Sequence, residues 1–182
     1  MNDTTARPCA SARFTSFFTE NTASAPLWLI VRFYLGYEWV TAGWEKFTNP
    51  AWFGTGAGAA LNGFIQGALT KTTGAHPDVQ FWYASFLQGA VLPHLVVWSN
   101  AVTLGEIAVG LGLIFGLFTC TAAFFGFFMN LNFLLAGTVS LSPIMIVLSI
   151  GLMSAHRVAG YWGLDRYAKP YCNRLCGCDT GR

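Results

Sequence analysis

The sequence has few charged residues. Asp, Glu, Lys and Arg together make up 10% of its 182 residues, whereas soluble domains carry about 25%. Hydrophobic residues make up 54% of the chain and the mean hydropathy is +0.48. A soluble monomer and a disordered chain are therefore both disfavoured, because disorder requires low hydrophobicity and high net charge. A formal net charge of +2 without a basic stripe also argues against nucleic acid as a partner.

Familiar catalytic motifs are missing as well. The sequence contains no P-loop, no nucleophile elbow, no H-E-x-x-H and no C-x-x-C-H haem attachment site. Covalent haem is therefore not expected. Two histidines, His94 and His156, lie inside or at the ends of apolar segments, but they fall at opposite ends of those segments. A haem held between these two imidazoles is therefore disfavoured.

The five cysteines do not form a typical metal or redox pattern. The tail spacing of Cys172, Cys176 and Cys178 is C-x3-C-x-C rather than the C-x2-C of common zinc and thioredoxin-like sites. With Cys9 these thiols would supply four metal ligands, but a reduced tail without metal is the simpler interpretation. The predicted outer loop has no cysteine, and Cys120 falls in a predicted cytoplasmic turn. A thiol-oxidising enzyme, which needs a reactive outer pair, is therefore disfavoured.

Long apolar runs dominate the rest of the chain. A membrane-spanning helix needs roughly 20 mostly apolar residues, and no formally charged residue lies between Glu106 and Arg157. Gly, Thr, Ser and Pro interrupt this run at 116–121 and 137–143. We therefore predict an all-α fold, an integral membrane four-helix bundle. Its helices are expected at about 26–44, 94–118, 121–136 and 143–162.

The long first loop, residues 51–93, is expected to hold two short interfacial helices. Apolar residues recur at helical spacing over 61–69. A second segment, 79–92, is rich in Trp, Tyr and Phe, and Trp and Tyr favour the headgroup layer of a bilayer. We predict that both helices cap the outer face of the bundle. The alternative is an ordinary lipid-contacting hairpin without a role in ligand access.

The distribution of Lys and Arg predicts the orientation. Basic residues precede the first predicted span and follow the last, and the two short turns have none. Because basic residues favour the cytoplasmic side, both termini are expected there. The chain then divides into a polar cytoplasmic N-terminal segment, 1–25, a membrane domain, 26–167, and a cysteine-containing cytoplasmic tail, 168–182.

Polar residues inside predicted spans are the main functional candidates, because each ionisable one costs about 2.5–3.5 kcal/mol to insert. Ser99, Thr103, Glu106 and Gly110 share one face of the second helix, which we expect to face the bundle interior. A buried carboxylate pairs with a cation or stays protonated. Glu106 is therefore the leading candidate for moving protons or orienting a ligand. A structural carboxylate that joins two helices is the alternative.

Other candidates lie on the first, third and fourth predicted helices. Arg32 is about 9 Å from the cytoplasmic end of its helix, shallow enough for its side chain to reach solvent. Asn130 and Asn132 point to opposite sides of their helix and cannot both face one ligand. His156 would hydrogen-bond a quinone carbonyl and transfer protons near neutral pH, or be structural. Arg157 would stabilise an anion or reduced quinone, or be a cytoplasmic anchor.

Several of these segments resemble a known family. The first span reads RFYLGYEWVTAGWEKF over 32–47, and the second reads GEIAVGLGLIFGLFT over 105–119. HPDVQFWY occupies 76–83, and HRVAGYWGLD occupies 156–165. In this order, over about 27–167, the motifs resemble the DoxX/DoxD family of four-helix membrane proteins. DoxD is the name of the membrane subunit of thiosulfate:quinone oxidoreductase.

The resemblance implies a quinone-linked subunit that passes electrons from thiosulfate or a similar sulfur compound to quinone. It also implies the inner or plasma membrane of a prokaryotic cell. The family's signature polar positions match Arg32, Glu38, Lys46, Glu106 and Arg157. Combining this with the residue-level reasoning, we assign roles as follows. The catalytic candidates are Glu106, His156 and Arg157, and the quinone-binding candidates are Arg32, Glu38 and Asn130.

Two other functions are compatible with the sequence. The chain would be a non-catalytic accessory subunit of a larger respiratory or photosynthetic membrane complex, with lipid and other protein subunits as its partners. The cysteine-bearing tail after Tyr167 departs from the family pattern, which favours a partner-binding adaptation. A small-molecule or ion permease is the third possibility, but four helices form a narrow bundle, so it would need to oligomerise.

Overall fold

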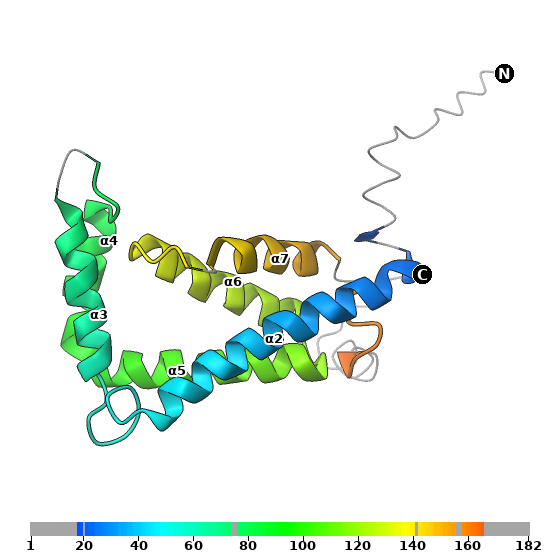
Figure 1. Ribbon diagram of the computed structural model, residues 1–182, viewed down its shortest axis with the longest axis horizontal. Coiled ribbons are helices and arrows are strands. Elements are labelled where there is room, and N and C mark those ends of the chain that lie inside the picture. The colour runs from blue at the N-terminus through cyan, green and yellow to red at the C-terminus, as the bar shows by residue number, and fades with distance from the viewer. Residues whose placement is uncertain (1–17, 20, 74–75, 141, 156–157, 166–182) are drawn as a thin grey trace, which may run out of the picture.

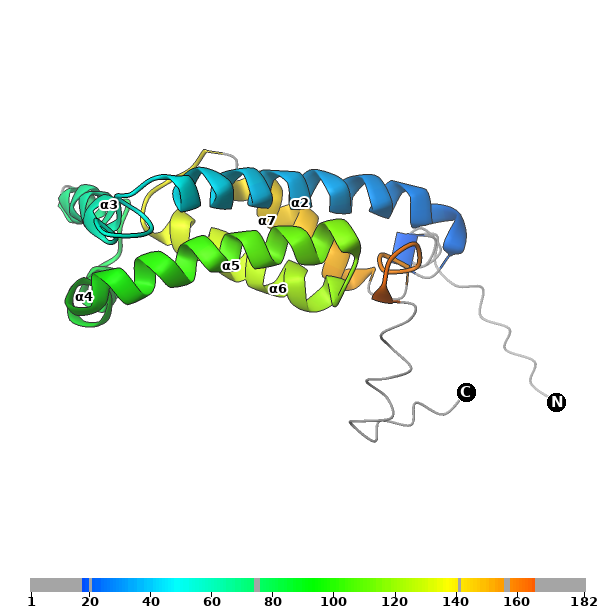
Figure 2. The same cartoon turned by 90° about the horizontal axis from the view of Figure 1, so that it is seen from below.

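Helices make up the regular structure of the described chain. The computed structural model describes residues 18–19, 21–73, 76–140, 142–155 and 158–165. The predicted all-α class is confirmed for these residues, in which no strand occurs. Four helices run side by side as a bundle, and two more lie across one end of it (Figures 1 and 2). The bundle helices are α2 (Ala25–Thr48), α5 (Leu95–Phe115), α6 (Thr119–Leu135) and α7 (Ser142–Ser154), and the crossing helices are α3 (Ala59–Leu69) and α4 (Phe81–Phe86).

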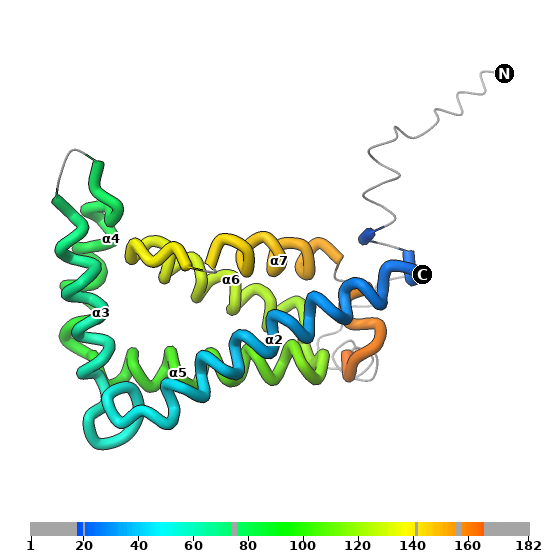
Figure 3. The backbone as a smooth tube through the Cα atoms, viewed as in Figure 1, coloured from blue at the N-terminus to red at the C-terminus, as the bar shows by residue number. Residues whose placement is uncertain are grey.

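Short turns connect these helices. The chain leaves α2, crosses the end of the bundle in α3, returns in α4 and bends into α5 (Figure 3). The two helices expected in the first loop are therefore present, although the second is shorter than expected. It continues as a π-helical turn and a 3-10 turn that lead into α5. The shorter turns are η1 (Thr22–Ser24), η2 (Thr70–Thr72), η3 (Leu87–Val91) and η4 (Leu92–His94).

The closest helix contact in the bundle is the seam between α2 and α5, where glycines face each other. A Cβ on Gly110 would lie 2.6 Å from the backbone nitrogen of Val40 and 2.8 Å from the carbonyl oxygen of Gly36. A Cβ on Gly43 would lie 2.9 Å from the backbone nitrogen of Ile107. Small residues at a helix contact let two backbones approach closely. The seam therefore fixes how α2 and α5 lie against each other along their length.

Large apolar side chains cover the outside of the bundle, and its interior combines an apolar core with several buried polar side chains. Ile30, Val97 and Val147 are each 67% exposed, whereas Ser99 and Thr103 are fully buried. Soluble proteins have the opposite preference, because burying polar groups costs free energy unless they are hydrogen-bonded. The surface of this bundle is therefore one that an apolar surrounding favours.

Within the described residues, one helical stretch is long and apolar enough to cross a bilayer, Phe81–Phe115. Helices α6 and α7 are apolar but have 17 and 13 residues, fewer than the roughly 20 expected for a span. Helix α2 has 24 residues and carries both acidic and basic side chains. The four predicted spans thus correspond to four bundle helices, of which one meets the length and hydropathy expected of a membrane crossing.

The fourth helix is shorter than predicted. We expected it over 143–162, but α7 ends at Ser154, and residues 158–165 form turns. These turns fold back over the end of the bundle, where the backbone nitrogens of Leu164 and Asp165 donate to the carbonyl oxygens of Phe115 and Gly116. The buried guanidinium of Arg32 binds carbonyl groups of the same turns, which a continuous helix would have paired internally.

Replacing Gly110 with Ala should destabilise the bundle, because the added methyl group would overlap the backbone of α2 at Val40. Overpacking of this kind costs about 1–3 kcal/mol, so the melting temperature of the purified protein in detergent should fall. Gly105→Ala is the matched control on the same helix, since its Cβ would meet no atom closer than 3.5 Å, the Sδ of Met129. An equal loss in both variants would contradict a tight α2–α5 seam.

Candidate functional site

A buried ion pair joins α2 to α5. The Lys46 ammonium donates to both carboxylate oxygens of Glu106, at 2.9 Å to Oε1 and 2.7 Å to Oε2. Only 1% of the Glu106 side chain is exposed. The ammonium also lies 5.4 Å from the ring centroid of Trp52 and 5.9 Å from that of Phe133. Hydrogen bonds between charged groups are stronger than neutral ones, and aromatic faces attract cations. The pair is therefore well held despite its burial.

The seam between α2 and α5 positions this pair. Gly43 lies in α2 just before Lys46, and a Cβ on it would lie 3.1 Å from the Cβ of Glu106. The absence of a side chain there brings the last turn of α2 within reach of the carboxylate. The predicted polar face of α5 is also observed, since Ser99, Thr103 and Glu106 are all buried. We predicted that Glu106 would either pair with a cation or stay protonated, and in the structure it pairs with a cation.

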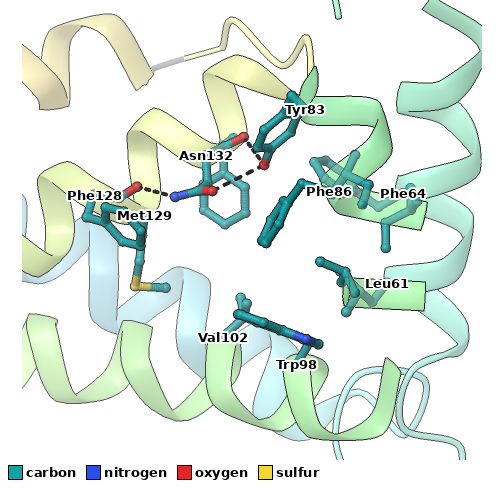
Figure 4. Close-up of a pocket in the computed structure, with 13 residues that line it drawn as sticks. Leu61, Phe64, Tyr83, Phe86, Trp98, Val102, Phe128, Met129 and Asn132 are labelled. Atoms are coloured by element: carbon teal, nitrogen blue, oxygen red, sulfur yellow. Dashed lines mark hydrogen bonds between the residues drawn. The ribbon is translucent and has the colours of Figure 1, made fainter. Parts of the chain in front are cut away.

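A cavity of about 160 Å³ lies between the crossing helices and the bundle (Figure 4). An engineered apolar cavity of roughly 150 Å³ holds a benzene molecule, so this space is the size of one aromatic ring. Its wall is almost entirely apolar. The residues that line it are Leu61, Phe64, Ile65, Tyr83, Phe86, Leu87, Val91, Trp98, Val102, Phe128, Met129, Asn132 and Phe133.

Two polar side chains stand at one side of the cavity. The Tyr83 hydroxyl donates to the backbone oxygen of Asn132 at 2.9 Å and lies 3.3 Å from its Oδ1 (Figure 4). The Asn132 Nδ2 donates to the carbonyl oxygen of Phe128 at 2.8 Å. An amide nitrogen carries two hydrogens, and one of them is used in this contact. The second amide hydrogen of Asn132 is the donor that a ligand oxygen would meet, because the single hydrogen of the Tyr83 hydroxyl is already donated to Asn132.

The ion pair and the cavity are neighbours. Phe133 lines the cavity and also lies against the Lys46 ammonium. Met129, another lining residue, faces Gly105, which precedes Glu106 in α5. One aromatic ring therefore separates an ionised, buried pair from a space that fits a ring. The combination offers a planar apolar site, a hydrogen-bond donor at one side and an exchangeable proton behind the wall.

Arg32 lies away from this site, beside the 158–165 turns. Its guanidinium donates to the carbonyl oxygen of Ala159 at 3.1 Å and to that of Trp162 at 3.2 Å, and only 1% of the residue is exposed. The expected extension to solvent is therefore wrong, because backbone carbonyls within reach satisfy the charge inside the protein. The glycines Gly116 and Gly163 leave room for it, since a Cβ on either would lie within 2.7 Å of a guanidinium atom.

The other predicted site residues are dispersed or undescribed. Glu38 is half-buried in the middle of α2, and its carboxylate makes no hydrogen bond among the described residues. Asn130 is buried, with its Nδ2 unpaired in the described part of the chain, and it faces away from the cavity that Asn132 lines. The candidates outside the described residues are His156, Arg157, Cys172, Cys176 and Cys178.

Sequence reasoning missed part of this site. The sequence predicts Tyr83 only as part of an interfacial aromatic segment, and it predicts Asn130 rather than Asn132 as a quinone-binding residue. Lys46 was noted as a family position but not as the partner of Glu106, 60 residues away. The available signal was the cost of a buried carboxylate, which requires a cation. Nothing in the local sequence says which of the nearby basic residues supplies it.

Removing the cation alone should cost more stability than neutralising the carboxylate. Lys46→Met should lower the free energy of unfolding by about 3 kcal/mol, because it leaves the Glu106 carboxylate buried and unpaired, and Glu106→Gln should lower it less, because the amide oxygen still accepts from Lys46. The double variant should lose clearly less than the sum. Denaturation of the wild type and all three variants in the same detergent measures this. Additive losses would show that the two side chains do not interact.

A match to a known protein family covers the first three bundle helices. The DoxX family model matches residues 27–140, which include Lys46, Glu106 and the residues that line the cavity. The match ends before the turns that bind Arg32. Searches of curated proteins and of solved structures found no match. The family model covers more than half of the 182 residues of this chain, and the chain therefore belongs to the DoxX family, a family of membrane-associated proteins.

Proposed function

We propose that the chain is an integral membrane protein whose four bundle helices cross a bilayer. The exposed apolar side chains on the outside of the bundle, and the polar side chains buried within its interior, support this. So does the direction of α3 and α4, which lie across the bundle end (Figure 1) and would rest along the membrane surface. Phe81 and Trp82, 86% and 60% exposed, would enter the interfacial layer, where aromatic residues concentrate. Lys and Arg before the first bundle helix and after the last favour a cytoplasmic position for both termini, and the family resemblance suggests a prokaryotic cell.

We further propose that the cavity binds the ring of a quinone. The observation that carries this proposal is a ring-sized apolar space with a hydrogen-bond donor at one side and a buried ion pair behind its wall. The second amide hydrogen of Asn132 would be donated to a carbonyl oxygen of the ring, and the Tyr83 hydroxyl, which is bonded to Asn132, would hold this side chain in place. A bound quinone supplies an acceptor for two electrons and two protons. The residues of this chain bind the ring, orient its oxygen and exclude water.

The ion pair has a separate role in this proposal. The Lys46 ammonium donates one proton to each carboxylate oxygen of Glu106, and one of these is the proton available for transfer. Phe133 lies between this proton and the cavity, so transfer requires a movement of that ring or a bridging water. His156 and Arg157 stay predictions for the cytoplasmic side. The resemblance to the thiosulfate-oxidising subunit suggests a sulfur compound as the electron source, delivered with a partner subunit.

A second function, that of an accessory subunit, is favoured by one surface of α5. Ala101, Gly105, Ala108 and Gly112 share one side of this helix and line an open apolar groove. Small residues of this kind are typical of contacts between membrane helices. In this case the chain would pack against other membrane subunits, and its polar interior would serve the stability of the bundle.

Removing the Asn132 donor, or the Tyr83 hydroxyl that holds it, should weaken quinone binding. Tyr83→Phe and Asn132→Leu are each expected to lower the affinity for a short-chain benzoquinone about tenfold, equivalent to about 1.4 kcal/mol. Titration calorimetry on the purified protein in detergent measures it. Tyr37→Phe is the matched control, since Tyr37 is 64% exposed and lines no part of the cavity. Equal quinone affinities for the wild type and all three variants would show that the quinone ring binds outside this cavity.

Catalysis is tested separately from binding. The double variant Lys46→Met/Glu106→Gln should fold and bind quinone, but it should lose quinone reduction by thiosulfate in the complex purified with gentle detergent. Unchanged turnover would show that the ion pair takes no part in the reaction.

The mass and composition of the native particle decide between the two functions. A small particle that reduces quinone supports the enzyme, and a large assembly with its own redox subunits supports the accessory role.

A further inference from the structure

A second apolar space runs along the outer side of α5 and α6. It is an open groove of about 760 Å³. Small residues of α5 form its base, and aromatic residues from both helices form its sides. Among the residues that line it are Trp98, Ala108, Phe115, Phe118, Thr121 and Phe125. From Trp98 to Phe115, the groove follows α5 for about 26 Å at 1.5 Å per residue. It is long and narrow, unlike the ring-sized cavity.

The groove and the cavity adjoin each other. Trp98, Val102, Phe128 and Met129 line both spaces. Figure 4 shows these four at the edge of the cavity, with Trp98 and Val102 projecting from α5, and Phe128 and Met129 from α6. The Met129 side chain is unbranched and adapts readily to a neighbour. A ligand whose ring lies in the cavity therefore has an apolar path past these residues into the groove.

The chemistry of the groove suits a hydrocarbon chain. Its walls offer methyl, methylene and aromatic groups, and a head group with charge or several oxygens would find no matching partners among the residues that line it. We propose that the groove binds the alkyl or prenyl tail of the ligand whose ring occupies the cavity. This inference rests on the proposed quinone function and deepens it, since it makes the ligand a long-tailed quinone rather than a free ring.

A transmembrane helix of a partner is the competing occupant, because small residues line the base. The position of the groove favours the tail. A binding site for a partner helix would need only the small residues of α5. This groove, however, also includes four residues that line the ring-sized cavity. Lipid tails are as apolar as the groove, so binding there gains free energy from packing rather than from leaving water. The expected contribution to affinity is therefore moderate.

The test compares two ligands, a benzoquinone without a side chain and the same ring with a decyl chain. Both are titrated into the full-length protein in lipid nanodiscs, and binding is measured by calorimetry. The wild type should bind the decyl compound about tenfold more tightly. Ala108→Phe fills part of the groove from a position that does not line the cavity. It should reduce the affinity for the decyl compound to that for the bare ring, and leave the affinity for the bare ring unchanged.

Val97→Phe is the matched control, because Val97 is 67% exposed on α5 and lines neither space. If Ala108→Phe does not fold, Leu111→Trp narrows the same groove and replaces it in the test. Equal affinity of the wild type for both compounds, or an unchanged ratio in Ala108→Phe, would overturn the tail site alone. Failure of the wild type to bind either quinone would overturn the proposed function itself. Loss of a native partner subunit from Ala108→Phe, with both affinities unchanged, would assign the groove to a helix and overturn the proposal.

Discussion

The close approach of α2 and α5 is the constraint on which the rest of this structure depends. Gly36 and Gly110 leave no room for a side chain between the two backbones. Where the same seam reaches Gly43, it brings Lys46 against Glu106. The ion pair in turn places the end of α2, so that the chain beyond it crosses the end of the bundle in α3 and α4. The cavity exists because these crossing helices meet α5 and α6 without filling the space between them.

Charge and shape are separated in this site. The ion pair lies against Trp52 and Phe133, while the cavity beside it offers apolar walls and two neutral polar side chains, Tyr83 and Asn132. A neutral planar ligand would therefore enter without displacing an ion pair from its partner. The strong local field of the ammonium and carboxylate would still act on it through one aromatic ring. This arrangement suits a molecule that is neutral on entry and changes its proton content afterwards.

Periodicity and breaking residues predicted much of the fold. The apolar run after Glu106 and its interruption near Gly116 and Gly137 were sufficient to separate α5, α6 and α7. The predicted end of the last helix was wrong, because residues 158–165 read as a continued apolar helix. Their backbone carbonyls instead bind Arg32 from the other end of the chain. The apolar pattern of one segment does not reveal a contact with a residue that lies 127 positions earlier in the sequence.

The candidate site, like the fold, was predictable only in part. The cost of burying a carboxylate singled out Glu106, and helical spacing separated Asn130 from Asn132. The contribution of Tyr83 was not predictable, because it depends on α4 folding back against the end of α6. Long-range packing also decides which cation reaches Glu106. Local sequence thus indicates which residues need a partner, and only the tertiary fold determines which partner each receives.

The carboxylate of Asp165 has a consequence for the order in which the protein is assembled. It accepts hydrogen bonds from the backbone nitrogens of Phe118 and Thr119 at the start of α6, at 2.6 and 3.0 Å. The first turn of a helix has unpaired N–H groups and a partial positive charge. During synthesis, α6 leaves the ribosome well before Asp165 does. The start of α6 and the buried charge of Arg32 must therefore wait for the same later segment, which closes one end of the bundle only after all four bundle helices have been made.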